Sequence, residues 1–435
     1  MPERLGSGTL RLSGGPWVSG WASSVGKKET EGPLGGLFDQ CHTDDSLGQQ
    51  SWEKAESLLL KEAAHLALRK AKVRPEEIDC VFAGDLLNQC AASVFGLRGL
   101  EIPFLGQYGA CSTMAQTLAM AAVFVEAGAA RRALAVTSSH FCSAERQFRL
   151  PLEYGGQRTP TAQWTATAAG ALILSGDLPA GTSQGIAVRD VRFGQITDLG
   201  VHDAANMGAA MAPAACRTLC GYFADTGAAP QDFDLILTGD LGAVGSDLLR
   251  GLMLREGWDI APVQNDGGLM LFDRAAQDVH AGGSGCGCSA SVLCAAVLPE
   301  LAAGRMKDVL FVGTGALMST TTSQRGRASP AWPIWCVWCR HGGKRAQNNG
   351  AARERPRRRN SRGAGRRYRA RNDSTGEISM PSQVFRYSCS FSRITRTPPA
   401  VSLSTFSGRM GSCTLRRSRN QPSPSPLPNE TRMPS

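Results

Sequence analysis

An internal repeat limits the fold of this chain more than any other feature. The stretch that begins at Pro75 (PEEIDCVFAGDL) is matched by a second one that begins at Pro230 (PQDFDLILTGDL). Each copy has the pattern of a turn, a short apolar strand and then Gly-Asp-Leu. A looser match relates the turn at 109–112 and its helix to the turn at 285–289 and its helix. Two such copies predict a duplicated α/β unit.

Hydrophobic spacing predicts the elements of both halves. Apolar residues at helical spacing predict a helix over 52–71, and further helices are expected over 91–97, about 111–125, about 213–227 and 292–303. The expected buried strands are 78–83, 133–138, 168–174, 185–193 and 309–312. Residues 1–50 are expected to form loops with at most one edge strand, and the polar stretch 143–167 an excursion from the core.

The expected strand ends indicate where a site would lie. Buried strands need helices on both faces of their sheet, and right-handed crossovers bring the ends of the strands together. Asp85, His140, Asp240 and Gly313 all lie at such ends. We therefore expect them around one crevice, between a first half over residues 1–228 and a second half over 229–325.

Cys111 lies where a Gly-rich turn becomes a helix, with Ser112 beside it. A thiol at a helix N-terminus faces unpaired N–H groups and the positive end of the helix dipole, which lowers a thiol pKa and favours a nearby anion. This pattern predicts a nucleophile or an anion-binding site. The alternative is a small buried residue in a tight turn, and the local pattern does not decide between the two.

The charge of the chain is divided unevenly along its length. Residues 325–435 hold 23 Lys and Arg against 4 Asp and Glu, whereas the rest holds 24 basic against 33 acidic residues. The first three quarters are therefore mildly acidic, and the basic excess lies in the tail. No apolar run is long enough for a transmembrane helix. The 14 cysteines are scattered without paired metal-ligand spacing, so we expect reduced thiols and no metal site.

Several longer stretches resemble the thiolase superfamily and, within it, the family of stage V sporulation protein AD. They are GKKETEGPLGGLFD, FAGDLLNQ, IPFLGQYGACST, TSSHFCSAERQFR, EYGGQ, MGAAMAPAA, DLILTGDL, VHAGGSGCGCSA and VGTGAL, and they extend from about residue 20 to residue 325. The resemblance implies an α/β thiolase-like fold, in which two duplicated halves form a layered α/β/α/β/α body. It also implies a homodimer, because thiolase-like proteins usually pair through strands of the first half.

The same resemblance implies a function without catalysis. Members of this family are expected to bind dipicolinic acid (pyridine-2,6-dicarboxylate), with which calcium can enter, and to assist its uptake into the developing spore. The expected partners are membrane proteins of the same sporulation operon, at the cytoplasmic face of, or peripheral to, the inner spore membrane. No nucleic-acid partner and no other cofactor is expected.

The expected ligand-binding residues are Asp85, Asn88, Cys111, Ser112, His140 and Arg146. A flat dicarboxylate requires helix N–H groups, one or two basic side chains and an apolar slot. Arg149 and Arg158 are further candidates for the basic groups. Asp85 would repel a bare dianion, so it is expected to meet calcium, to accept from a donor beside the ring, or to cap a helix. His140 is expected either to touch the ligand or to brace the Arg-rich stretch.

The alternative function is an acyltransferase of the thiolase or ketoacyl synthase type that uses Cys111. Such enzymes need a His to activate the thiol and a second polar group that stabilises the oxyanion. The corresponding second-half loop, APVQNDGGLMLF, offers Asn265 but no His. His280, His202 and the pair Cys286 and Cys288 are weaker candidates, each with an ordinary structural alternative. The binding function requires fewer special groups.

The tail beyond Arg325 is expected to be a disordered basic arm, and its codons suggest why. The residues Gly326 to Trp335 can be encoded as GGG AGA GCA TCC CCG GCA TGG CCC ATC TGG. Translated from the third base, the same string gives Glu-Ser-Ile-Pro-Gly-Met-Ala-His-Leu, which resembles the ending that the family usually has. A single missing base near the Gly326 codon would explain this, so residues 326–435 are expected to be translated out of frame.

Overall fold

The computed structural model describes residues 1–148, 158–316, 328, 330–331 and 335–342. The chain divides into two compact units, residues 1–352 and 353–435, and the second lies outside the described residues. All elements named below belong to the first unit. We describe that unit by itself.

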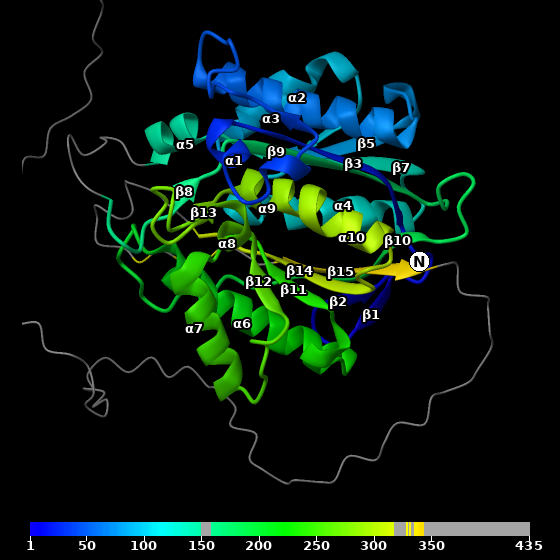
Figure 1. Cartoon of the computed structure of the whole chain (residues 1–435). Helices are drawn as coiled ribbons and strands as arrows, with labels where there is room; N and C mark the ends of the chain where they lie inside the picture. Colours follow the sequence, from blue (N-terminus) through cyan, green and yellow to red (C-terminus); the bar gives the residue numbers. More distant parts are fainter. Residues whose placement is uncertain (149–157, 317–327, 329, 332–334, 343–435) are drawn as a thin grey trace, which may run out of the picture. The chain divides into compact units, whose positions relative to one another are not determined.

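The first unit has five layers, helices alternating with sheets (Figure 1). One outer layer is formed by α2 (Trp52–Ala71) and α3 (Ala91–Leu97), and the opposite one by α6 (Met207–Thr226) and α7 (Gly242–Arg255). The central layer contains α4 (Thr113–Glu126), α9 (Cys286–Val292) and α10 (Leu298–Ala302), with a π-helical turn, Leu293–Val297, between the last two. Three shorter helices are α1 (Lys27–Thr30), α5 (Phe141–Phe148) and α8 (Gly267–Leu271).

The strands follow the path β12-β11-β14-β15-β10-β3-β9-β7-β5-β6. The first-half strands are β3 (Trp17–Val25), β5 (Cys80–Gly84), β6 (Phe104–Gly106), β7 (Arg132–Ser139) and β9 (Ala168–Ser175). The second-half strands are β10 (Gly185–Arg192), β11 (Leu235–Thr238), β12 (Gln264–Asp266), β14 (Asp308–Gly313) and β15 (Trp335–Gly342). The short strands are β1 (Glu3–Leu5), β2 (Thr9–Arg11), β4 (Gln40–Cys41), β8 (Trp164–Thr165) and β13 (Gly283–Ser284).

Strand directions show that the two halves are duplicates. In the first half, β3-β9 and β9-β7 are antiparallel, whereas β7-β5 and β5-β6 are parallel. In the second half, β10-β15 and β15-β14 are antiparallel, whereas β14-β11 and β11-β12 are parallel. The repeated sequences therefore form β5 and β11 at equivalent positions. The thiolase-like α/β fold expected from the sequence is confirmed.

The second half differs from its expected bounds at both ends: it begins with β10, before the boundary expected at residue 229, and it extends beyond residue 325. Strand β15, Trp335–Gly342, lies between β14 and β10, where it takes the place that β9 has in the first half. Its Val337 and Cys339 side chains are buried in the core. Without this strand, the neighbouring edges of β14 and β10 would lack their hydrogen-bonding partner. The remainder of the expected basic tail, residues 343–435, lies outside the described residues.

Two further expectations change in the structure. Residues 1–50 contain β3, a nine-residue strand inside the path rather than an edge strand. The expected excursion 143–167 contains most of α5 and all of β8, and residues 149–157 lie outside the description. By contrast, the helix expected over 52–71 has those bounds as α2. Ser51 caps it by accepting from the Lys54 N–H, and Lys72 ends it in the left-handed conformation.

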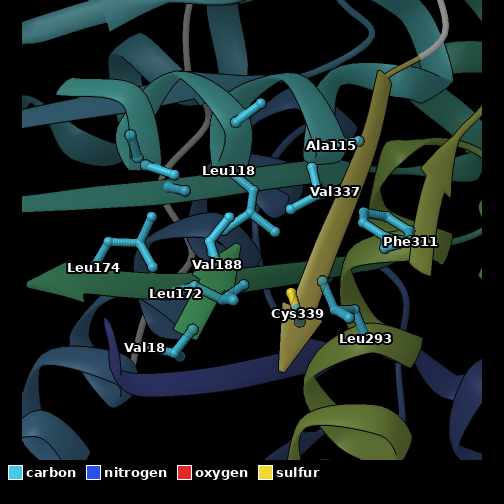
Figure 2. Close-up of a cluster of buried hydrophobic side chains, with 14 of the residues drawn as sticks. Val18, Ala115, Leu118, Leu172, Leu174, Val188, Leu293, Phe311, Val337 and Cys339 are labelled. Atoms are coloured by element: carbon cyan, nitrogen blue, oxygen red, sulfur yellow. The ribbon is translucent and has the colours of Figure 1, made fainter. Parts of the chain in front are cut away.

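The main core lies between the sheets and the central helices (Figure 2). Leu118 of α4 and Leu293 of the π-helical turn are fully buried there, together with Leu172 of β9 and Phe311 of β14. Helix α4 is rich in alanine, so both sheets approach it closely without leaving voids. This packing fixes the start of α4, where Cys111 lies.

Candidate functional site

Cys111 lies in a 3-10 turn, Ala110–Ser112, that leads directly into α4. Ala110 has a φ of 50°, a left-handed conformation that is uncommon for residues other than glycine. The turn is held by Ser112 Oγ, which donates to the Gly109 carbonyl at 2.7 Å, and by Thr113 Oγ1, which donates to the Ala110 carbonyl at 2.5 Å. The Cys111 side chain is buried as a result.

The second half closes over this turn. A Cβ atom added to Gly315 would lie 3.0 Å from the Gly109 carbonyl oxygen and 3.1 Å from the Ser112 nitrogen. Gly313, at the end of β14, approaches α4 equally closely, because a Cβ there would lie 2.5 Å from that of Ala115. The end of β14 therefore packs against the start of α4, as the crevice predicted from the repeat requires.

The carboxyl group nearest to Cys111 belongs to Asp240. Cys111 Sγ lies 3.8 Å from Ser284 Oγ, and Ser284 Oγ donates to Asp240 Oδ2 at 3.2 Å. Asp240 also accepts from the Gly285 N–H at 2.8 Å and from Thr314 Oγ1 at 2.5 Å. Asp240 was expected at the crevice but not among the ligand-binding residues. The Gly-Asp-Leu ending of the second repeat is the signal that marks it.

This environment disfavours the thiolate form of Cys111. Burial and the negative charge of Asp240 raise the pKa of the Cys111 thiol well above its usual value. Burial also raises the pKa of Asp240, against the hydrogen bonds from Thr314 and Gly285. Catalytic cysteines react as thiolates, which a neighbouring base or positive charge must favour. The turn before α4 thus holds a protonated thiol, contrary to what a helix N-terminus alone would favour.

His140 and His280 form hydrogen bonds with groups other than Cys111. His140 Nε2 bonds to the Asp45 carbonyl at 2.8 Å, its Nδ1 accepts from the Cys142 N–H at 3.2 Å, and burial lowers its pKa. His280 Nδ1 bonds to the Thr159 carbonyl at 2.8 Å. Within the residues described, no hydrogen bond joins either imidazole to Cys111. His140 therefore has the contacts of the bracing alternative.

Asn265 does not replace the missing imidazole either. Its side chain is exposed, and its Oδ1 accepts from the Asp266 N–H at 2.8 Å. The acid of this loop, Asp266, is buried and accepts from the N–H groups of Leu241, Gly242 and Gly268. Burial raises the pKa of Asp266 to about 7. The loop therefore braces the turn after β11, where Asp240 lies.

Asp85 has the contacts of a helix cap. Its Oδ1 accepts from the Leu87 N–H at 2.8 Å, and its Oδ2 accepts from the Ser93 N–H at 2.8 Å and from Ser93 Oγ at 2.6 Å. Burial raises the pKa of Asp85. Nearby Glu56 accepts from Ser138 and Ser143, and burial together with the charge of Asp85 raises its pKa to about 8. Two buried carboxyl groups thus support the first-half side of the crevice.

Asn88 and Arg146 have their polar contacts with residues other than Cys111. Asn88 and Gln147 form two mutual hydrogen bonds, at 3.1 and 3.2 Å. Arg146 forms an ion pair with Glu53 of α2 and is half exposed. On α5, it is Ala144 that packs with Cys111, and a residue two positions along a helix points to the opposite side. The described contacts therefore link Asn88 to Gln147 and Arg146 to Glu53, and none of them joins either residue to Cys111.

Small side chains form the rest of the surroundings of Cys111. Leu86, Ala144 and Cys286 pack with it in one cluster. Cys286 Sγ donates to the Ser138 carbonyl at 3.0 Å, and burial raises the pKa of this thiol too. Across the described part of the chain, no three His, Cys, Asp or Glu side chains are arranged to hold a metal ion. Arg149 lies outside the described residues, and Arg158 lies at Trp164, beside β13.

Comparison with known proteins places the chain in a family. The family model described as stage V sporulation protein AD matches residues 6–333. Stage V sporulation protein AD of Bacillus subtilis (strain 168) is 42% identical over 327 residues, which is 75% of this chain and 95% of the relative.

Two solved structures resemble the fold. One is 3-oxoacyl-[acyl-carrier-protein] synthase III from Aquifex aeolicus VF5, with 13% sequence identity and a TM-score of 0.47, and the match covers 75% of this chain and 100% of that one. Another is a variant of OleA from Xanthomonas campestris with cerulenin, with 13% sequence identity and a TM-score of 0.47, and the match covers 76% of this chain and 97% of that one. The extent and identity of the sequence matches, rather than these distant structures, decide the family. The chain belongs to the stage V sporulation protein AD family.

Proposed function

We propose that this sporulation protein binds dipicolinate without transforming it and thereby assists its uptake into the developing spore. The observation that carries the proposal is the contact network of Cys111, in which the ionisable partner is the carboxyl group of Asp240. A carboxylate opposes formation of the thiolate that acyl transfer needs. A buried site with a protonated thiol and an acid is suited to holding a ligand rather than to attacking one.

Asp240 can contribute to binding in its neutral form. Burial raises its pKa, and a protonated carboxyl group can donate a hydrogen bond to a ligand carboxylate. In its ionised form, it would instead favour a ligand whose charge calcium has neutralised. The two cases differ in their calcium dependence, so binding with and without calcium separates them.

The direct test is titration calorimetry of the full chain with dipicolinate, in the presence and absence of calcium. Saturable binding, with the ligand recovered unchanged, is expected. A wild-type protein that fails to bind under both conditions would contradict the proposal. A parallel incubation with an acyl thioester tests the alternative function, because a ketoacyl synthase should form a thioester at Cys111.

We also propose that the protein acts as a homodimer at a membrane, next to membrane proteins of its operon. Edge strand β6 ends the path, and near it Phe95, Phe104 and Tyr108 expose large apolar surfaces. Such a cluster next to an open strand edge suits a second copy of the chain. In the described portion, no helix combines the length and apolar character needed to cross a bilayer.

Light scattering after gel filtration tests the dimer. Twice the chain mass is expected at micromolar concentration, and Phe95→Glu should shift the protein towards the monomer. A wild-type monomer at that concentration would contradict this part of the proposal.

A further inference from the structure

A pair of cations shares one aromatic ring near Cys111. Lys28 Nζ lies 4.1 Å from the centroid of the Trp164 ring, and the Arg158 guanidinium carbon lies 4.7 Å from it. The Phe141 ring stacks on the same indole, with centroids 3.7 Å apart and an angle of 9° between the planes. Since Phe141 covers one face, the two cations share the other.

Four separate segments build this cluster, because Phe141 belongs to α5 and Asp278 to the loop before β13. Lys28 belongs to α1, in the stretch GKKETEGPLGGLFD, and Arg158 precedes β8. The guanidinium is held by Asp278, which pairs with it at 2.7 Å and accepts a second bond at its carbonyl at 2.8 Å. Because both cations stack on the same Trp164 ring, their positive charges are held close to each other.

The cluster around Trp164 contains more positively than negatively charged side chains. Asp278 pairs with both Arg158 and His280, the latter at 3.0 Å. Glu29, next to Lys28, turns inward instead, where it accepts from the Thr167 N–H at 2.9 Å, and burial raises its pKa to about 8. Arg158 Nη1 is buried, and no described residue accepts a hydrogen bond from it. Asp278 is therefore already paired with two basic side chains, Lys28 forms no ion pair with a described residue, and one Arg158 donor has no acceptor among the described residues.

The cluster lies next to the wall of the Cys111 site. Strand β8 pairs with β13, so Trp164 is opposite Gly283 and Thr165 is opposite Ser284. Ser284 is the residue whose hydroxyl lies 3.8 Å from Cys111 Sγ. Neighbouring residues of a strand point to opposite faces, so the Trp164 ring and the Ser284 hydroxyl lie on opposite faces of this short ladder. An anion bound by Lys28 and Arg158 would thus lie one residue pair from Ser284, behind the wall that faces the thiol.

We propose that Lys28 and Arg158 form the recognition site for the two carboxylates of a planar aromatic dicarboxylate, one cation for each carboxylate. The inference rests on the proposed binding of dipicolinate and names the residues that select it. Binding relieves the repulsion between the cations and satisfies the free guanidinium donor. Arg158 is one of the further candidates that the sequence offered for the basic groups, whereas Lys28 was not expected to bind the ligand.

The test compares dipicolinate with pyridine-2-carboxylate, which lacks one carboxylate, by calorimetry on the full chain. The wild type should prefer dipicolinate by about ten-fold or more, the value of one charge-assisted hydrogen bond. Lys28→Met and Arg158→Met should each weaken dipicolinate binding by about ten-fold and remove the preference over the monocarboxylate. Lys27→Met is the matched control, because that side chain is exposed and pairs only loosely, at 4.0 Å, with Glu31.

Lys28→Arg keeps the charge and should keep most of the affinity, which separates loss of the cation from damage to α1. Dipicolinate binding that persists unchanged in both Met variants would overturn this inference alone. A wild-type chain that binds no dipicolinate would overturn the proposed function and this inference with it. Equal affinity of the wild type for both ligands would leave the proposed function intact and exclude two-cation recognition.

Discussion

Asp85 and Asp240 follow equivalent strands of the two halves, yet they bind different groups. Asp85 follows β5 and accepts from Leu87 and Ser93 within its own half. Asp240 follows β11 and accepts from Ser284 Oγ, beside the thiol of Cys111 in the other half. Duplication therefore supplied two buried acids, of which one caps a helix and the other faces the site.

Cys111→Ser should leave dipicolinate binding within a few-fold, a shift of under about 1 kcal/mol. The hydroxyl has nearly the size of the thiol and keeps the contact with Ser284. Cys111→Arg should abolish binding, because the larger side chain fills the space beside Leu86 and Ala144. Calorimetry measures both variants. If the wild type instead transfers acyl groups, and Cys111→Ser removes that activity, Cys111 is a nucleophile and the proposed function is wrong.

Asp240→Asn should lower the pKa of Cys111, because it removes the negative charge that disfavours the thiolate. The alkylation rate of Cys111 with iodoacetamide, followed by peptide mass spectrometry from pH 7 to 10, should reach its midpoint at a lower pH than in the wild type. Asp198→Asn, on an exposed loop, should leave the midpoint unchanged. An identical midpoint in Asp240→Asn would show that this carboxylate does not control the thiol.

Glu56 should make the protein less stable as the pH rises. Burial raises the pKa of Glu56 to about 8 in the folded state, whereas an unfolded glutamate has a pKa of about 4.3. The unfolded state therefore loses its proton first, so this contribution is complete below about pH 4.3 and is lost as the pH rises through 8. The free energy of unfolding should fall by up to about 1.4 kcal/mol per pH unit in this interval.

Urea unfolding at pH 5, 6, 7 and 8 measures that slope. Glu56→Gln cannot titrate, and its amide can accept from one of the two serine hydroxyls, Ser138 or Ser143, and donate to the other, so its slope should be shallower than that of the wild type. The exposed residue Glu76 provides the matched control, Glu76→Gln, which should keep the wild-type slope. Parallel curves for Glu56→Gln and the wild type would mean that Glu56 is ionised in the folded protein.

Asp85→Ala should lower stability by roughly 0.5–2 kcal/mol, the usual cost of losing a helix cap. The loss should be the same with and without dipicolinate and calcium, because the contacts of Asp85 are with Leu87 and Ser93. Thermal unfolding under the four conditions measures it. A ligand affinity that falls only when calcium is present would instead assign calcium to Asp85.

The repeat allowed the duplicated halves, the strand ends and the crevice to be predicted. Strand β3, by contrast, could not be predicted as a strand inside the sheet. The sequence of β3, WVSGWASSV, mixes serine and glycine with apolar residues, so it shows neither an apolar run nor a clean alternation. Two of its serines, Ser23 and Ser24, are nevertheless buried because distant groups satisfy them, as Glu62 does for Ser24 at 2.8 Å.

Contacts between segments that are far apart in the sequence explain why the site in the structure differs from the one expected from the sequence. Arg146 lies within a stretch typical of the family, but its partner Glu53 lies on another helix. The network of Asp240 joins residues from four segments of the chain, and no spacing along the sequence reveals it. The pairing of Lys28 and Arg158 over Trp164 also depends on the fold alone.

The codons of β15 make the frame prediction more specific. Tryptophan has the single codon TGG, and both cysteine codons begin with TG. The pairs Trp335-Cys336 and Trp338-Cys339, translated from the third base, therefore each give GTG, valine, whichever cysteine codons are used. The other frame thus supplies a valine-containing segment that suits the position between β14 and β10.

Resequencing across the Gly326 codon should reveal a missing base, and the chain with the restored frame should unfold at a higher temperature than the present one. Its closing strand would place β-branched residues against Phe311 and Val188, in the core that Cys339 now enters. The present chain is the control, measured in the same buffer. An intact frame, together with close relatives that carry the same Arg-rich extension, would contradict the slip. The basic tail would then call for a nucleic-acid-binding assay over a range of salt concentrations.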